Sequence, residues 1–415
     1  MQYLSVKRLL VLFIFLVTAV LLGFGLWYVF FRPVSLTTET PALPEASYAL
    51  PRAGNSSGTN ILITAPGSLP QAGYSQTITE EKNQPKEKAD GLQTTLIAQN
   101  ITRPISVSPQ NQGVVRYYDE SEGKFYYALP DGGKAAISEK VFFHVKDVAW
   151  GKRSDKAILS FPDGSKLFYD FTNDVQASLP SYWEDIEFSP QDEQIVAKSL
   201  GRSRSNRFLI TANPDGTESK AIEELGDNQS KVQVSWSPND HVIAFSHTGD
   251  PIGQDREAVL LIGKEHENFQ SLITDGRGFI PNWSPSGNIL AYSVYKSTTG
   301  YRPLLWVSGA ASNNVNAGRS NFNLFTWADK CAWQSERTLI CGVPIELGEG
   351  AALQRELFDT GPDVLYRIDI TTGRVTVLGP IEGNGAVKDI TIAPGDTSIF
   401  ITEKRTGRLL KISLY

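Results

Sequence analysis

Residue types that carry out catalysis are present in this sequence, but few of them stand in a recognisable pattern. The histidines occur singly; they are His144, His241, His247 and His266. His241 and His247 flank the apolar stretch Val-Ile-Ala-Phe-Ser, where they could share a metal ion or simply mark the two ends of a surface strand. No H-E-x-x-H motif, P-loop or complete G-x-G-x-x-G motif occurs. The sequence therefore predicts no catalytic residue, no metal and no cofactor.

Carboxylates offer another kind of chemistry, because a suitably spaced pair can cleave a glycosidic bond. Most acids of this chain stand in turns, where they accept backbone hydrogen bonds; examples are Asp131, Asp163, Asp215, Asp240 and Asp275. Four tryptophans recur along the chain, and they could pack a core or offer a platform to a sugar; they are Trp150, Trp236, Trp283 and Trp333. A carbohydrate-active protein therefore stays open as an alternative.

The two cysteines, Cys331 and Cys341, stand on two predicted strands that flank the turn Gln-Ser-Glu-Arg-Thr. Antiparallel pairing can bring such positions face to face. A disulfide between them would be stable outside the cytoplasm, and two buried thiols are the alternative. Two cysteines cannot build a disulfide framework or a four-cysteine metal site.

A short pattern recurs seven times along the chain and predicts the strands and turns that position these residues. An apolar or aromatic anchor is followed by a polar turn, often Ser-Pro, and then by an apolar stretch. The anchors are Val107, Trp150, Phe188, Trp236, Trp283, Trp333 and Ile392. A strand-only repeat of about 40–50 residues is typical of a β-propeller with one four-stranded blade per repeat. We predict an all-β fold, a seven-bladed β-propeller over residues 91–415, in preference to six or eight blades.

The two ends of the repeat array predict how the ring closes. The last repeat stops at Tyr415, after only its third strand. One strand, residues 92–98, is left unassigned before the first anchor. We expect it to supply the fourth strand of the last blade, which leaves no long open edge.

One repeat resembles a known family. The segment ITDGRGFIPNWSPSGNILAYSVYKSTTGYRPLLWVSG (273–309) is similar to the repeat of TolB-type propellers, whose core is a Trp-Ser-Pro-Asp-Gly turn before an Ile-Ala-Phe strand. WD-repeat propellers are also similar in having one blade per repeat, although no repeat here ends in Trp-Asp. The resemblance implies a propeller and often an envelope location, but no single activity. TolB itself is a six-bladed periplasmic partner of a lipoprotein, so seven anchors depart from it.

The N-terminus predicts a membrane anchor. Residues 9–31 contain no charge, and as a helix they would be long enough to cross a hydrocarbon core of about 30 Å. Lys7 and Arg8 precede this span and only Arg32 follows closely, so the positive-inside rule places residues 33–415 outside the cytoplasm. A cleaved signal peptide would have a shorter apolar region. We expect residues 1–32 to be a cytoplasmic tip and a single-pass transmembrane signal anchor in the cell membrane.

A linker should follow the anchor. Residues 33–90 hold seven prolines and many Ser, Thr and Gly, with few apolar residues. Such a segment cannot bury enough apolar surface to offset the entropy of ordering. We expect an extracytoplasmic linker, with the propeller in the periplasm or at the cell surface.

Loop lengths indicate where a partner would bind. Loops between second and third strands vary, whereas turns between first and second strands stay short, and variable loops on a rigid scaffold often bind. The candidate binding residues are Arg202, Arg204, Arg207, Asp250, Asp255, Arg256, Tyr301, Arg302, Glu346, Glu349, Arg355, Glu356 and Asp359. Their mixed charge favours another envelope protein as partner, and the net charge of −6 argues against nucleic acid.

These observations predict a membrane-anchored, extracytoplasmic β-propeller that acts as a non-catalytic protein-interaction scaffold in the cell envelope. The alternative is an extracytoplasmic propeller enzyme of the hydrolase or lyase type, or a carbohydrate-binding protein. Acids or histidines clustered at the channel mouth would favour the alternative, whereas bare aromatic and aliphatic loop tips would favour the scaffold. The oligomeric state is not indicated.

Overall fold

The computed structural model describes residues 17–18, 20–22, 92–99, 101–109, 114–129, 131–253, 255–392 and 398–414, with the backbone alone at 101–103. Residues 17–18 and 20–22 are helical. Within the described residues, no helix combines the length and the apolar character that crossing a membrane requires. The predicted anchor (1–32) and linker (33–90) lie almost wholly outside the described residues, so both stay predictions.

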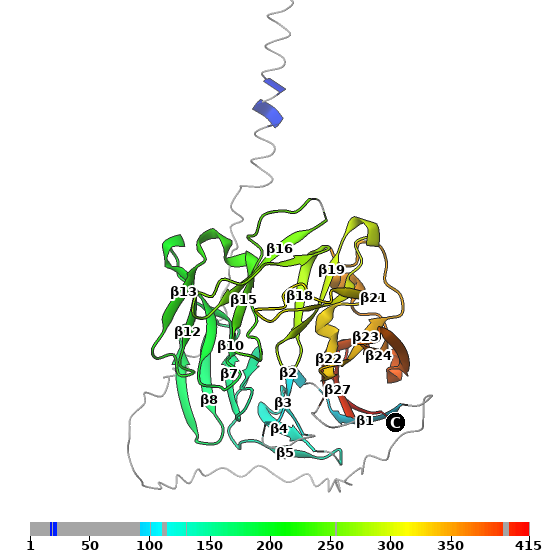
Figure 1. The fold of residues 1–415 in the computed structure, drawn as a ribbon. Helices are drawn as coiled ribbons and strands as arrows, with labels where there is room; N and C mark the ends of the chain where they lie inside the picture. Colours follow the sequence, from blue (N-terminus) through cyan, green and yellow to red (C-terminus); the bar gives the residue numbers. More distant parts are fainter. Residues whose placement is uncertain are drawn as a thin grey trace, which may run out of the picture. The chain divides into compact units, whose positions relative to one another are not determined.

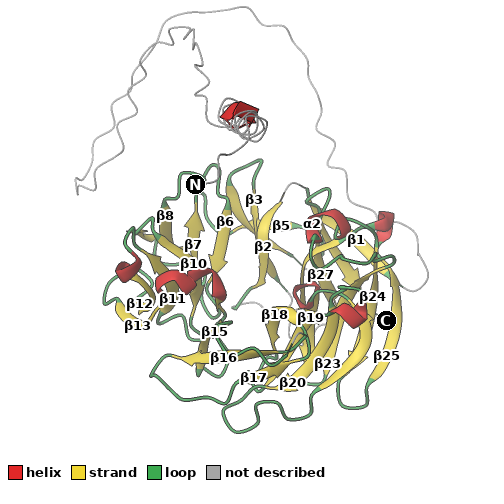
Figure 2. Cartoon of the chain, turned by 90° about the horizontal axis from the view of Figure 1, so that it is seen from above, coloured by secondary structure: helices red, strands yellow, loops and turns green. Residues whose placement is uncertain are grey.

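The described part of the C-terminal region forms seven antiparallel sheets of four strands each, arranged in a ring (Figures 1 and 2). The predicted seven-bladed β-propeller is confirmed. First strands of neighbouring blades contact one another at several places around the ring, so the first strand of each blade lies innermost. Second strands are the most buried, as β15, β19 and β27 illustrate, because each is covered by a blade on both sides.

The first four blades have the following strands. Blade 1 contains β2 (Ile101–Val107), β3 (Val115–Asp119), β4 (Lys124–Ala128) and β5 (Lys134–Ala136). Blade 2 contains β6 (Asp147–Trp150), β7 (Lys156–Ser160), β8 (Lys166–Asp170) and β9 (Val175–Leu179). Blade 3 contains β10 (Trp183–Phe188), β11 (Ile195–Leu200), β12 (Arg207–Ala212) and β13 (Lys220–Glu224). Blade 4 contains β14 (Val232–Val234), β15 (Val242–Ser246), β16 (Glu257–Gly263) and β17 (Leu272–Thr274).

The other three blades follow the same order. Blade 5 contains β18 (Arg277–Trp283), β19 (Ile289–Tyr295), β20 (Leu304–Gly309) and β21 (Ser320–Phe325). Blade 6 contains β22 (Cys331–Ser335), β23 (Thr338–Pro344), β24 (Asp363–Asp369) and β25 (Arg374–Pro380). Blade 7 contains β26 (Val387–Ile392), β27 (Ser398–Glu403), β28 (Leu409–Ser413) and β1 (Gln93–Ala98). Short helices lie between strands: η1 (Arg204–Asn206), η2 (Gly226–Lys231), η3 (Ser297–Thr299), η4 (Ala328–Lys330), α2 (Arg355–Phe358) and η5 (Glu382–Asn384).

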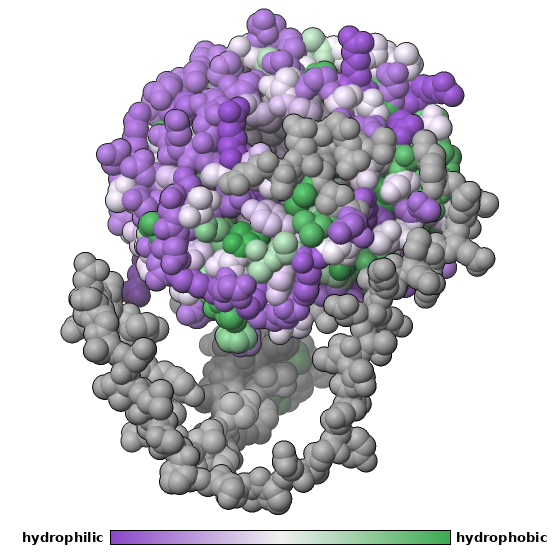
Figure 3. Space-filling model, turned by 90° about the horizontal axis from the view of Figure 1, so that it is seen from below, coloured by the Kyte–Doolittle hydropathy of each residue, from purple (hydrophilic) through white to green (hydrophobic). Residues whose placement is uncertain are grey.

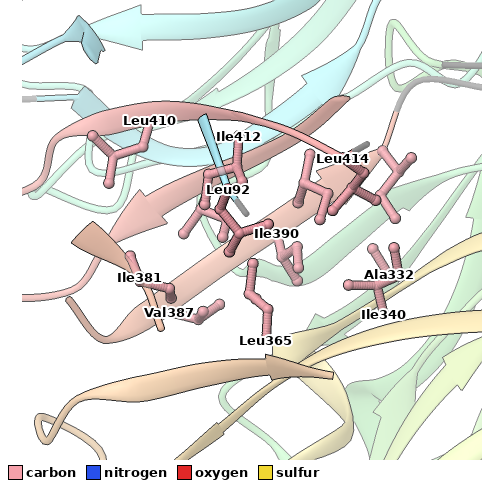
Figure 4. Close-up of a cluster of buried hydrophobic side chains, with 13 residues drawn as sticks. Leu92, Ala332, Ile340, Leu365, Ile381, Val387, Ile390, Leu410, Ile412 and Leu414 are labelled. Atoms are coloured by element: carbon pink, nitrogen blue, oxygen red, sulfur yellow. The ribbon is translucent and has the colours of Figure 1, made fainter. Parts of the chain in front are cut away.

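Strand β1 closes the ring, as the sequence predicts. It pairs antiparallel with β28, so that Gln93 lies opposite Ser413 and Leu96 opposite Leu410. Leu92 just before β1 joins a buried apolar cluster with Leu410, Ile412 and Leu414, and residues of β26, β27 and blade 6 complete this cluster (Figure 4). The last blade is therefore built from both ends of the propeller sequence.

The Ser-Pro turns have a defined geometry that explains their repetition. In blades 3, 4 and 5 a buried serine, namely Ser189, Ser237 or Ser284, accepts a hydrogen bond from the backbone N–H five residues later, at the start of the second strand. Three residues after each serine stands Asp192, Asp240 or Gly287, each with positive φ. Asp, Asn and Gly adopt this conformation most readily, so the pattern S-P-x-D/G specifies the turn.

Neighbouring blades are tied together near these turns. The buried Asp192 of blade 3 accepts hydrogen bonds from the backbone N–H groups of Lys152, Arg153 and Ser154 in blade 2. The fully buried Arg116 of blade 1 donates to the carbonyl oxygen of Gly151, also in blade 2. These turns therefore form an interlocked framework between the first three blades.

Three of the four repeated tryptophans form hydrogen bonds between blades, whereas the indole N–H of Trp236 donates to Asp240 within its own blade. The indole N–H of Trp150 donates to the carbonyl of Pro104, that of Trp283 to Ser235, and that of Trp333 to the carbonyl of Asn282. Each bond reaches back to the preceding blade. A tryptophan held in this way favours the packing interpretation over a sugar platform.

Cys331 and Cys341 lie directly opposite each other on β22 and β23. In the structure their sulfur atoms form a disulfide, with an S–S distance of 2.08 Å. The bond joins the two innermost strands of blade 6, so it constrains the blade and not a surface loop.

Candidate functional site

The strand order separates two faces of the propeller. The loops between second and third strands and the blade-to-blade connections lie on one face, which we call the long-loop face. The turns between first and second strands and between third and fourth strands lie on the other, which we call the turn face. The largest loop of the long-loop face, residues 345–362, joins β23 to β24 and contains α2.

Most candidate binding residues are accessible on the long-loop face. Eight are exposed: Arg202, Arg204, Asp250, Arg256, Tyr301, Glu346, Glu349 and Glu356. Four are half-buried: Arg207, Asp255, Arg302 and Arg355. Asp359 is only 1% exposed, which corrects the expectation that it lies at the surface.

Asp359 is buried because it belongs to an ionic cluster beneath the largest loop. Its carboxylate accepts hydrogen bonds from Lys330 Nζ, Arg355 Nε and Lys404 Nζ, each at 2.8 Å. Burial alone would raise the pKa of Asp359, but the three cations lower it below its usual range. Asp363 also contacts Lys330, at 2.6 Å, yet burial outweighs this contact and raises the pKa of Asp363. Asp359 is thus the anionic anchor that holds the loop down.

The candidate residues come from four predicted loops between second and third strands, residues 201–207, 247–257, 295–302 and 344–362. Three of these loops are joined to one another. Ser297 Oγ in blade 5 donates to Asp255 Oδ2 in blade 4 at 2.6 Å. The backbone N–H of Gly350 in blade 6 donates to the carbonyl of Gly300 in blade 5 at 2.8 Å. The fourth loop, residues 201–207, instead contacts η2 through ion pairs from Arg204 and Arg207 to Asp227. The structure therefore brings three of the four loops into one hydrogen-bonded series and ties the fourth to the next blade connection.

Large apolar side chains are exposed mainly on this face. In the described part of the propeller, ten large hydrophobic residues are exposed, and eight of them stand in loops of the long-loop face: Val141, Phe143, Tyr182, Ile252, Tyr301, Ile345, Leu353 and Leu357. Leu357 is 70% exposed although its loop is anchored by Asp359 two residues later. The other two, Val175 and Val377, stand on outermost strands. Figure 3 shows, on the side it displays, small hydrophobic patches set in a mostly hydrophilic surface.

A pocket of about 410 Å³ opens on the same face between blades 4 and 5. Its lining consists of His247, Gly249, Pro251, Arg256, Glu257, Arg277, Gly278 and Phe279. His247 Nδ1 lies 2.9 Å from Glu257 Oε1, and a carboxylate partner requires this nitrogen to be the donor. Of these residues only Arg256 was predicted as a site residue. The position of His247 directly after β15 and of Glu257 at the start of β16 is the signal that could have revealed the pair.

The innermost strands enclose a second opening, of about 550 Å³, along blades 1 to 4. Asp147, Asp185 and Glu187 contribute carboxylates to its lining. Asp185 pairs with Lys198 at 2.6 Å, and Glu187 pairs with Lys152 at 2.9 Å. At least two of the three acids are therefore paired with lysines.

The histidines do not assemble into a metal site. His241 and His247 stand at opposite ends of β15, so they cannot share an ion. No group of three or more His, Cys, Asp or Glu residues in the described parts of the chain could hold a metal ion.

Comparison with known proteins identifies the fold. No family model matches this sequence, and no curated protein matches it. Among solved structures, an oligogalacturonate lyase in complex with manganese superposes with a TM-score of 0.56 and 12% identity, covering 80% of this chain and 96% of that one. The Cps50 (Swd1) β-propeller domain of Myceliophteria thermophila gives a TM-score of 0.52 and 12% identity, covering 78% of this chain and all of that one.

A third similar structure is an oligogalacturonate lyase from Vibrio parahaemolyticus, with a TM-score of 0.51 and 10% identity over 78% of this chain and 93% of that one. At such identities the likeness concerns the fold alone. Together with the seven four-stranded sheets, these neighbours establish a seven-bladed β-propeller.

Proposed function

We propose that this chain is a non-catalytic protein-interaction scaffold whose long-loop face binds a partner protein of the cell envelope, and that residues 1–32 anchor it in the membrane. The observation that carries the proposal is the distribution of exposed apolar side chains, eight of ten on one face. Exposed aromatic and aliphatic loop tips are typical of protein contacts.

The construction of the largest loop supports this function. Its polar base is fixed by Lys330, Asp359 and Lys404, whereas Leu353 and Leu357 point their apolar side chains to solvent. A loop that is already ordered loses little conformational entropy when a partner binds. Apolar residues held in this way are suited to be anchors of an interface.

The charge of the face favours a protein over a uniformly charged polymer. Arg202 and Arg204 are exposed on one loop, whereas Glu346, Glu349 and Glu356 are exposed on another. A partner that presents both signs would complement this surface, and such complementarity chiefly gives specificity and faster association.

One experiment tests both the docking face and the location. The full-length chain is crosslinked in intact cells with a membrane-impermeant reagent, and the captured proteins are identified by mass spectrometry. A protein should be captured by the wild type and by Val377→Ser, in which an exposed valine on β25 is changed. Capture should fall at least about tenfold with Leu353→Ser/Leu357→Ser, since burying two leucines contributes about 2–3 kcal/mol.

Two results would contradict the proposal. Equal capture by the leucine variant and by Val377→Ser would remove the long-loop face as the docking site. A propeller that reacts with the impermeant reagent only after cells are broken would place it in the cytoplasm and remove the envelope role.

The enzymatic alternative has one observation in its favour, the hydrogen-bonded pair of His247 and Glu257 in a pocket. Such a pair can act as a general base. The lining of this pocket contains a single carboxylate, Glu257, whereas cleavage of a glycosidic bond usually uses two. The scaffold therefore remains the function that we propose.

A further inference from the structure

We propose that the pocket between blades 4 and 5 binds a small monoanionic carboxylate that carries an apolar body. This site goes beyond the proposed docking function and does not depend on it. The walls come from the loop after β15, the start of β16 and the start of β18, so two blades contribute to it. Its volume of about 410 Å³ lies in the range typical of small-ligand pockets.

The arginines of the pocket favour an anion. Asp275 is shared by Arg256, at 3.0 Å, and by Arg319, at 3.5 Å, so one carboxylate faces two guanidinium groups. Arg277 is exposed in the pocket lining, and its side chain makes no ion pair or hydrogen bond within the described residues. A guanidinium presents a planar set of donors that matches a carboxylate in a bidentate manner.

The acids of the pocket set a limit on the charge of the ligand. Glu257 lies in the lining beside His247, and Asp275 lies behind Arg256. Two carboxylates so close to the site would repel a phosphate group, which carries a charge of about −1.5 to −2 near neutral pH. A single carboxylate can instead bind the guanidinium of Arg277 without facing a second negative charge of its own.

The shape of the pocket is fixed by two glycines. A Cβ atom at Gly249 would lie 2.2 Å from the carbonyl oxygen of Ala258, and one at Gly278 would lie 2.2 Å from Tyr295 Cε1. Gly278 also has a φ of +66°, which side chains rarely tolerate. Pro251 and Phe279 supply apolar surface next to the charged groups. The pocket thus offers a cationic end and an apolar end in a small rigid space.

The test uses a matched pair of probes, N-acetylphenylalanine and its uncharged amide, titrated into the purified full chain by calorimetry. The acid should bind saturably, and the amide should bind at least about tenfold more weakly, because it lacks the charge-assisted hydrogen bonds that a carboxylate forms with a guanidinium. Arg277→Gln should weaken binding of the acid about tenfold and leave binding of the amide unchanged. Arg374→Gln, at an exposed arginine on β25, is the control and should bind both probes as the wild type does.

Circular dichroism shows whether Arg277→Gln is folded. Arg277→Lys keeps the positive charge without the planar guanidinium donors, so its affinity for the acid should fall between those of wild type and Arg277→Gln. Three results would overturn the proposal: no saturable binding of the acid, equal binding of acid and amide, or unchanged binding by Arg277→Gln. Tighter binding of inorganic phosphate than of the acid would also overturn it. These measurements do not depend on partner capture in cells, so a negative result here would leave the docking proposal unaffected, and the reverse also holds.

Discussion

The turn face and the long-loop face of this propeller are built from the same seven repeats. The turn face repeats one buried hydrogen bond, whereas the loops of the long-loop face differ from blade to blade. On the turn face, Ser189, Ser237 and Ser284 each bury a hydroxyl in the same hydrogen bond. On the long-loop face, the loops between second and third strands range from four residues in blade 1 (120–123) to eighteen in blade 6 (345–362). The repeated turns give the propeller its rigid framework, whereas the loops that differ from blade to blade can bind a partner.

The long-loop face also contains a fixed part. The largest loop has its own buried anchor, because Asp359 binds Lys330, Arg355 and Lys404. The long-loop face therefore combines a fixed polar base with apolar tips, and the tips alone are free to contact a partner. Substitutions in the framework should therefore affect stability, whereas substitutions of the exposed leucines should affect partner binding.

The largest effect should follow from removing the closing strand. Deletion of residues 92–98 leaves β28 paired only with β27, as an open edge strand, and exposes the apolar cluster around Leu410 and Ile412. We expect a loss of several kcal/mol in the free energy of unfolding, enough to abolish a cooperative thermal transition. Circular dichroism during heating measures this. An unchanged melting temperature would show that ring closure does not stabilise the domain.

A framework residue of the turn face should come next. Asp192→Ala removes the acceptor for three backbone N–H groups of blade 2 and leaves them without their partner. We expect the free energy of unfolding to fall by about 3 kcal/mol in urea denaturation. The adjacent Gln191 is exposed, so Gln191→Ala should change it by less than about 0.5 kcal/mol. Similar effects of both substitutions would refute the role of Asp192 between blades.

The smallest effect on stability should come from the tips. Leu353→Ser/Leu357→Ser changes two exposed side chains, so the free energy of unfolding should stay within about 0.5 kcal/mol of wild type while partner capture falls. The same urea denaturation series measures it beside Asp192→Ala. A large loss of stability would mean that these leucines pack within the fold, and the loss of capture could then no longer be assigned to docking.

The sequence was sufficient for the framework because its signals are local. Ser-Pro followed by Asp or Gly predicts a turn from four neighbouring residues. The last repeat lacks a fourth strand, and the strand at 92–98 was the one strand left to fill that position. The surface chemistry depends on residues that are distant in the chain. Asp359 is buried by Lys404, 45 residues away, and Arg277 joins His247 from the next blade. No local pattern could predict these contacts.

Ring closure by β1 also has a consequence for biosynthesis. β1 is the first strand of the propeller to be synthesised, whereas its partner β28 ends at Ser413, about 320 residues later. At roughly 5–20 residues per second, β1 remains without its partner for tens of seconds. Blades 1 to 6 can form in turn as the chain emerges, but the ring stays open until β28 has been made. Closure of the propeller is therefore coupled to the synthesis of its last strand.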